Sequence, residues 1–234
     1  MNNGRGFVMA KVRSERWGAP GMKQLVEVDE QPLLSRTFQM IKDCGIDPCL
    51  FLYANEAPTQ EELNVLTLIV DTLSKGWEYA TNETLGRSNE TEWPLIEAML
   101  KVYKQWEFMS GPLIFYLGDV YYSQAIIDAI CKDSALMGIK FYGSDYEIFA
   151  VKIHPRMIDL EALVNKALHL DITKQYKLWS LYNAVTNDIK SFGTHKVPGL
   201  TNPYYFNVKS IDDATTQDFN TMESYNQFIN QKKE

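Results

Sequence analysis

The chain has 234 residues, 45% of them hydrophobic, which allows one full hydrophobic core and predicts a single domain over residues 1–234. Its formal net charge of −7 at pH 7 disfavours a broad nucleic-acid-binding surface, because such a surface needs a basic face. The sequence has no apolar run near the roughly 20 residues of a membrane span and no apolar core of a signal peptide, so we expect no membrane partner. The cysteines do not have the spacing typical of disulfides or zinc sites, so we expect a cytoplasmic protein.

The first predicted element is a short buried strand from Phe7 to Ala10, followed by a loop rich in glycine, proline and basic residues. The loop carries four cations in a chain that is acidic as a whole: Lys11, Arg13, Arg16 and Lys23. Because the local charge is opposite to the overall charge, we expect this loop to bind an anionic ligand.

Helices and strands then alternate along the chain. Helical periodicity covers residues 32–43, an apolar run at 49–53 predicts a strand parallel to the first, and a second helical pattern covers residues 59–73. Thr59 and Glu62 have the spacing of a capping box at the start of that second helix. This order of elements favours an α/β fold with a mostly parallel sheet.

The strand predicted at residues 113–117 leads to a candidate ligand-binding residue, Asp119. Residues 77–80 predict a strand, 85–91 an irregular loop and 94–106 a helix, before the uncharged run at 113–117 that is typical of a central strand. Asp119 follows this run after Gly118, at the place where open α/β sheets bind ligands. A lone aspartate at a strand end can also cap a turn or helix, but Ser123 is the better cap for the helix that follows.

The last third of the chain is predicted to hold two more strands at 138–143 and 147–153, helices at 158–170 and 172–188, and a strand at 204–208. The long loop at 191–202 is a candidate flap over an acceptor. Asn220 or Thr221 is expected to cap the final helix with help from Glu223.

Several of these segments resemble one family. Ala10, Arg16-Trp17-Gly18, Lys23-Gln24-Leu25 and Pro32-Leu33-Leu34 stand where the MobA-like NTP transferase (sugar nucleotidyltransferase) superfamily has its opening motifs, and the tail from Asp218 to Tyr225 is similar to the superfamily's ending. The chain resembles compact phage-encoded members. The resemblance implies a single-domain GT-A-like (Rossmann-like) fold with a mixed, mostly parallel sheet flanked by helices.

The resemblance also implies roles for the basic loop and the loop ahead of the third helix. Arg16 and Lys23 match the catalytic cations that neutralise a triphosphate, and the nucleotide is expected to contact a further set of residues. That set is Ala10, Lys11, Arg13, Gly86, Arg87 and Ser88.

By the same resemblance, Asp119 holds the catalytic Mg²⁺ or Mn²⁺, with Asp218 as the second ligand and Asp213 as its alternative. Carboxylate oxygens suit this role because a hard divalent cation offsets the charge of phosphoryl transfer. Asp145 and Glu147 are candidate acceptor-binding residues, or alternatively charges that protect a strand edge.

The loop departs from the family pattern in its glycines. Lys11, Val12 and Ser14 replace glycines that let backbone amides approach phosphate, and Glu15 adds a carboxylate that would repel a triphosphate.

The resemblance leaves three candidate functions. The first is a nucleotidyltransferase that joins an NMP moiety to a phosphorylated sugar or similar acceptor, and the second is a GT-A-like glycosyltransferase that uses a nucleotide-sugar, with a modified base in DNA as one acceptor. The third is a non-catalytic nucleotide or sugar binder. The loss of glycines favours the glycosyltransferase, because a diphosphate-linked donor needs less of the phosphate-binding loop.

Overall fold

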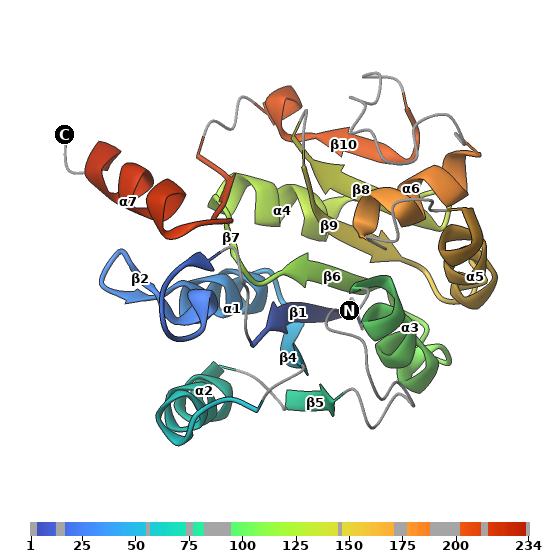
Figure 1. The fold of residues 1–234 in the computed structure, drawn as a ribbon. Helices are drawn as coiled ribbons and strands as arrows, with labels where there is room; N and C mark the ends of the chain where they lie inside the picture. Colours follow the sequence, from blue (N-terminus) through green and yellow to red (C-terminus); the bar gives the residue numbers. More distant parts are fainter. Residues whose placement is uncertain are drawn as a thin grey trace.

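The computed structural model describes residues 4–12, 17–54, 57–73, 77–81, 95–144, 147–170, 177–187, 202–211 and 215–232. Their centre is a seven-stranded sheet in the order β10-β8-β9-β6-β1-β4-β5 (Figure 1). The strands are β1 (Arg5–Lys11), β4 (Asp47–Ala54), β5 (Trp77–Thr81), β6 (Leu113–Leu117), β8 (Ile139–Gly143), β9 (Ile148–Ile153) and β10 (Tyr205–Asn207).

The sheet is mixed and mostly parallel, as the sequence predicts. β1 lies in the middle and pairs in parallel with β4 on one side and with β6 on the other. β9 is antiparallel to both of its neighbours, β6 and β8, and β10 pairs in parallel with β8. The carboxyl ends of β1, β4, β6, β8 and β10 therefore meet at one edge of the sheet, which is also the edge where β9 begins.

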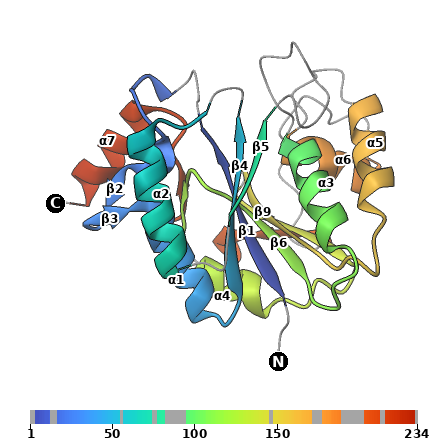
Figure 2. The same cartoon turned by 90° about the horizontal axis from the view of Figure 1, so that it is seen from below.

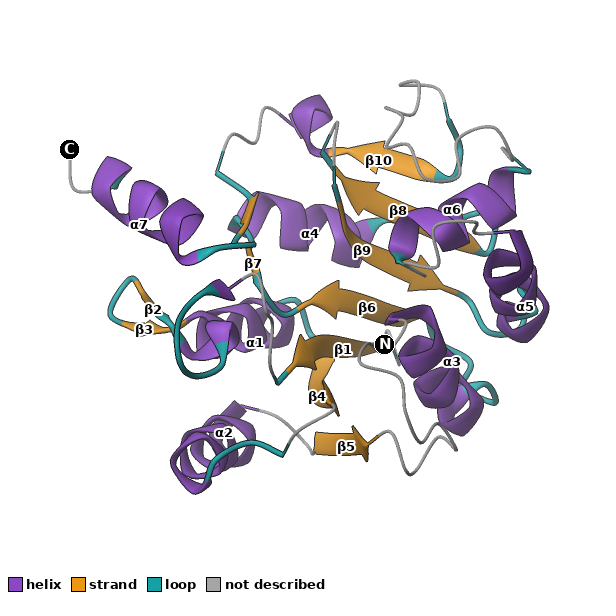
Figure 3. Ribbon diagram, viewed as in Figure 1, coloured by secondary structure: helices purple, strands orange, loops and turns teal. Residues whose placement is uncertain are grey.

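Helices cover both faces of the sheet (Figures 2 and 3). One face carries α1 (Leu33–Asp43), α2 (Gln60–Leu73) and α4 (Gln124–Lys132); the other carries α3 (Leu95–Trp106), α5 (Leu160–Leu170) and α6 (Leu178–Thr186). A hydrophobic core lies on each face of the sheet, and alternate residues of β1 belong to different cores. Phe7 and Met9 pack on the side of α3, α5 and α6, whereas Val8 and Ala10 pack on the side of α1, α2 and α4. None of the described helices is long and apolar enough to cross a bilayer.

Local hydrogen bonds fix where the helices begin. Thr59 and Glu62 form the predicted capping box, with the Thr59 N–H donating to Glu62 Oε2 at 2.7 Å and the Glu62 N–H donating to Thr59 Oγ1 at 3.2 Å. Ser123 caps α4 as predicted. At the final helix the expected partner was wrong: Thr221 is the cap, but Ser224 completes the capping box because it, and not Glu223, stands at the third helical position.

Short elements gather beside the α1 face. They are η2 (Lys23–Leu25), β2 (Glu27–Val28), β3 (Gln31–Pro32), β7 (Val120–Tyr121), η5 (Val208–Ile211), β11 (Gln217–Asp218) and α7 (Met222–Gln231). β11 pairs antiparallel with β7, which brings the end of the chain next to the end of β6. A third, smaller core joins this region and consists of Trp17, Val28, Leu33, Tyr121, Phe219 and Phe228.

Candidate functional site

The candidate site lies where the order of the strands reverses. The chain builds β1, β4 and β5 outward in one direction and then returns to place β6 on the other side of β1. Ligands of open α/β sheets bind beyond the carboxyl ends of the strands at such a switch point. Lys11 ends β1 at this point, and Gly118 and Asp119 follow β6.

Gly118 allows a close approach between the backbone of the turn after β6 and the backbone of β1. Its N–H donates to the Met9 carbonyl at 2.9 Å. A Cβ at position 118 would lie 3.0 Å from the Met9 carbonyl oxygen and 3.3 Å from Gln24 Cγ, so a larger residue would push the turn away. Asp119 is thereby held close to η2, which carries Lys23.

Lys23 and Asp119 form an ion pair inside the site. The Lys23 side chain is only 5% exposed and that of Asp119 is 20% exposed. Both groups are largely removed from water, so each depends on the other for charge compensation. In the described part of the chain, Lys23 is therefore the built-in counter-ion of Asp119.

Asp218 reaches the same place from the other end of the chain. β11 pairs Asp218 with Val120, and the next amide, Phe219 N–H, donates to the Asp119 carbonyl at 3.0 Å. The Asn220 side chain donates to Asp218 Oδ2, whereas Asp218 Oδ1 is buried without a hydrogen-bond partner in the described structure. A buried acceptor of this kind is costly unless a ligand satisfies it.

The carboxyl group of Asp218 is affected electrostatically by two others, Asp119 and Glu147. Burial, then the charge of Asp119 and to a smaller extent that of Glu147 raise the pKa of Asp218 to about 8, although the charge of Lys23 opposes the shift. The same cluster raises the pKa of the buried Tyr122, first by desolvation and then through Asp119. The site thus crowds carboxyl groups together around one ammonium group, and at neutral pH the raised pKa favours the protonated form of Asp218.

The donor set fits a divalent cation of the Mg²⁺ class. The described residues contain no group of three or more acidic, histidine or cysteine side chains suited to a metal ion. Mg²⁺ is commonly bound through only one or two carboxylates, with water and substrate phosphates completing its shell. Asp119 and Asp218, with the buried unsatisfied Oδ1, supply those two carboxylates.

The other predicted site residues divide into two groups. Ala10 is fully buried in the α1-side core, so only its backbone could contact a ligand. Glu147 starts the segment that leads into β9, and its N–H donates to Ser144 Oγ at 3.2 Å. The remaining candidates lie outside the described residues: Arg13, Arg16, Gly86, Arg87, Ser88, Asp145 and Asp213.

Two supporting residues are absent from the sequence-based set. Tyr122 is fully buried, and its hydroxyl lies 3.1 Å from the Leu117 carbonyl and 2.8 Å from the Phe149 carbonyl, so it ties the end of β6 to β9. Gln24 is 1% exposed and packs against Gly118. The tyrosine pair at positions 121 and 122, after the Gly118-Asp119 turn, was the available signal for Tyr122, whereas Gln24 belongs to the Lys23-Gln24-Leu25 match but was given no role.

Comparisons with known proteins support the fold. No family model matches the chain, and no curated protein matches its sequence. Among solved structures, a nucleoside-diphosphate-sugar pyrophosphorylase from Vibrio cholerae RC9 superposes with a TM-score of 0.61 at 8% identity, covering 96% of this chain and 99% of that one.

Two further structures agree at similar coverage. A 4-diphosphocytidyl-2C-methyl-D-erythritol synthase from Anaerococcus prevotii DSM 20548 matches with a TM-score of 0.52 at 11% identity, covering 97% of this chain and 99% of that one. A protein from Mycobacterium tuberculosis H37Rv matches with a TM-score of 0.54 at 15% identity, covering 97% of each chain. The chain therefore shares its fold with these structures along nearly its whole length.

Proposed function

We propose that the protein is a metal-dependent nucleotidyltransferase that moves an NMP moiety from an NTP to a phosphorylated sugar or similar acceptor. The observation that carries the proposal is the meeting of Asp119, Asp218 and Lys23 at the switch point of the sheet. The fold of the neighbouring nucleotide-processing enzymes supports it.

In the proposed reaction, an acceptor phosphate oxygen bonds to the α-phosphorus of the NTP, the bond from that phosphorus to the bridging oxygen breaks, and pyrophosphate leaves. A divalent cation held by Asp119 and Asp218 would supply positive charge to the phosphate oxygens. Lys23 would exchange its contact with Asp119 for a phosphate oxygen of the donor. Lys11, at the end of β1, lies at the same edge of the sheet.

The remaining assignments follow from the resemblance alone. Arg13 and Arg16 would bind the triphosphate, residues 86–88 would contact the nucleobase or ribose, and Asp145 and Glu147 would contact the acceptor. Of these only Glu147 belongs to the described residues, and its charge acts on Asp218.

A thermal-shift titration tests the proposal. NTPs and nucleotide-sugars are added with and without Mg²⁺ or Mn²⁺, because a ligand that binds the native state raises the melting temperature by mass action. Release of pyrophosphate from an NTP is then measured over a panel of sugar phosphates. Stabilisation by NTP and cation together, followed by pyrophosphate release, is the expected result; no stabilisation by any of these ligands would instead favour a non-catalytic scaffold.

One observation favours glycosyl transfer as the second candidate. Val12 stands where the family has a phosphate-binding glycine, but its side chain is fully buried and its N–H donates to the Tyr53 carbonyl at 3.3 Å. This amide is therefore engaged within the sheet edge and not directed to phosphate. A nucleotide-sugar that stabilises the protein more than its parent NTP would support a glycosyltransferase, and sugar transfer to DNA with a modified base would identify that acceptor.

A further inference from the structure

The position of Asp218 depends on a very short strand. β11 contains only Gln217 and Asp218, which pair with Tyr121 and Val120 of β7. Two paired residues are not a stable element by themselves. The segments on either side of β11 must therefore hold Asp218 next to Asp119.

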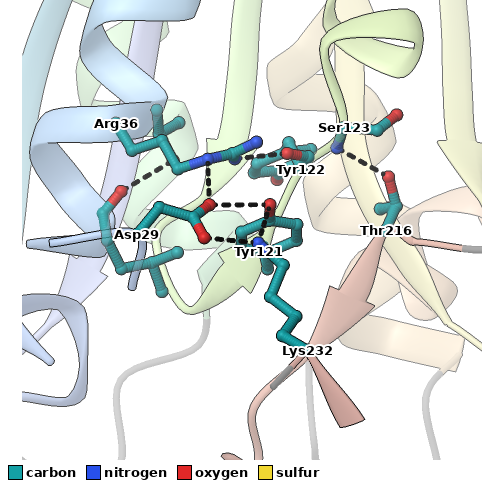
Figure 4. A network of polar contacts seen from close by, with 9 residues as sticks. Asp29, Arg36, Tyr121, Tyr122, Ser123, Thr216 and Lys232 are labelled. Carbon is teal, nitrogen blue, oxygen red and sulfur yellow. Dashed lines mark hydrogen bonds and ion pairs between the residues drawn. The ribbon is translucent and has the colours of Figure 1, made fainter. Parts of the chain in front are cut away.

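Tyr121 is the centre of the contacts that fix the C-terminal segment (Figure 4). Its hydroxyl donates to Asp29 Oδ2 at 3.0 Å and lies 2.7 Å from Lys232 Nζ, which also pairs with Asp29 Oδ1 at 2.5 Å. The Arg36 guanidinium carbon lies 3.9 Å from the centre of the Tyr121 ring, and Lys232 Nζ lies 4.6 Å from it. The ring is thus in contact with a cation from α1 and with one from the end of α7.

The same ring packs against α7, which in turn packs against the residue after Asp218. Tyr121 is 5% exposed, and its ring centre lies 4.7 Å from that of Phe228 on α7. Phe228 contacts Phe219 at 5.1 Å, and Phe219 is fully buried. Because Phe219 directly follows Asp218, these ring contacts connect Tyr121 to the position of the Asp218 carboxylate.

A second contact leads from Phe219 to the site itself. Its N–H donates to the Asp119 carbonyl at 3.0 Å, so the backbone after Asp218 is bonded to the backbone of Asp119. Upstream, Thr216 Oγ1 accepts from the Ser123 N–H at 3.0 Å, which attaches the chain just ahead of β11 (Figure 4). Both attachments keep their geometry only while the C-terminal segment stays docked.

We propose that Tyr121 is a positioning residue that holds Asp218 beside Asp119, acting through Phe228 and Phe219, with Lys232 closing the contact from the end of α7. The inference rests on the proposed function only for the purpose of the pair, which is to bind a divalent cation. In this proposal Tyr121 itself touches neither the nucleotide nor the divalent cation.

Tyr121→Phe tests the role of the hydroxyl because it keeps the ring and its packing. Amide hydrogen exchange at Phe219 is measured without any metal, and binding of Mn²⁺ alone is measured by calorimetry. We expect exchange at Phe219 to rise about tenfold, the factor typical of losing one or two hydrogen bonds of a buried hydroxyl, and the dissociation constant for Mn²⁺ to rise several-fold. Exchange within β1 is expected to stay unchanged.

Two further variants and a matched control complete the test. Lys232→Met should reproduce both effects, and Lys232→Arg should retain most of the unsubstituted behaviour because a cation can still pair with Asp29 and lie over the Tyr121 ring. Tyr103→Phe is the control: Tyr103 is also 5% exposed and its hydroxyl donates to the Ile158 carbonyl at 2.7 Å, but it lies near the end of β9, at the opposite edge of the sheet. This control should lower stability without changing Phe219 exchange or Mn²⁺ binding.

Unchanged exchange at Phe219 in Tyr121→Phe and Lys232→Met would overturn the proposal. Faster exchange with unchanged Mn²⁺ affinity would also overturn it, because Asp218 would then not depend on the docked segment. If the unsubstituted protein binds no Mn²⁺, the cation site of the proposed function is refuted, and exchange at Phe219 alone decides whether Tyr121 holds β11.

Discussion

Replacing Lys23 by methionine should change stability and cation binding in opposite directions. Methionine keeps the length of the side chain but removes the ammonium group that pairs with Asp119. Breaking a buried ion pair leaves an uncompensated charge and costs about 3 to 5 kcal/mol. Since Asp119 stays 20% exposed to water, we expect the low end of this range, about 3 kcal/mol, or a fall of roughly 6 to 12 °C in melting temperature for a chain of this size.

A divalent cation should restore what the substitution removes. In Lys23→Met the carboxylates of Asp119 and Asp218 no longer share an ammonium group, so Mn²⁺ meets more negative charge and less repulsion. We expect Mn²⁺ to bind the variant about tenfold more tightly than the unsubstituted protein and to raise its melting temperature by more. Nucleotide binding in the presence of Mn²⁺ should weaken, because a phosphate contact is lost.

Lys140→Met is the matched control for this experiment. Lys140 pairs with Asp133 at 2.6 Å, with 22% and 14% of the two side chains exposed, but the pair lies near the start of β8, at the edge opposite the site. Its loss should lower stability to a similar extent and leave Mn²⁺ affinity unchanged. Calorimetric titration of both variants with Mn²⁺ decides the matter, and an equal or weaker affinity in Lys23→Met would refute the reasoning that Lys23 occupies the cation site.

Three other predictions concern single residues of the site. Asp119→Asn should keep the fold while lowering metal-dependent transfer by about 100- to 1000-fold, which turnover and melting temperature together measure; full activity would remove the metal role. The folded pKa of Asp218 is raised to about 8, so the stability that its protonated form contributes is lost as the pH rises from about 4 through about 8. Asp218→Asn does not titrate, so its free energy of unfolding should gain up to about 5 kcal/mol relative to the unsubstituted protein over that range, which urea titrations measure. Val12→Gly should cost about 2 to 3 kcal/mol by removing a buried side chain and should not tighten NTP binding, since the Val12 amide already bonds Tyr53; a tighter NTP complex in equilibrium dialysis would contradict this.

The large elements could be predicted because their signals are local and repeated. The run from Phe7 to Ala10 is apolar on both faces, and the structure buries it between two helical layers. The capping boxes are equally local, although counting from the wrong cap residue led to Glu223 in place of Ser224. Periodicity and caps therefore located the sheet and the helices on which the site is built.

The small elements could not be found in the same way. β7 and β11 have two residues each, too few for a period, and their pairing joins positions about one hundred residues apart. The ion pair of Lys23 with Asp119 likewise depends on how closely Gly118 approaches β1. Asp218 was identified only because the end of the chain resembles the C-terminal motif of a family. The residues that follow Asp218 have a sufficient structural role as a helix cap and gave no separate signal of a site.

The charge of the site implies that nucleotide and cation assist each other. Among the described residues, the charges of Asp119 and Glu147 both act on Asp218, and Lys23 is the cation that opposes them. A triphosphate that arrived alone would add negative charge beside these carboxyl groups, and a cation that arrived alone would be repelled by Lys23. In the proposed function, Lys23 would contact phosphate when both are bound, and the cation would take its place beside Asp119. By linkage, each ligand must then raise the affinity of the other by the same factor.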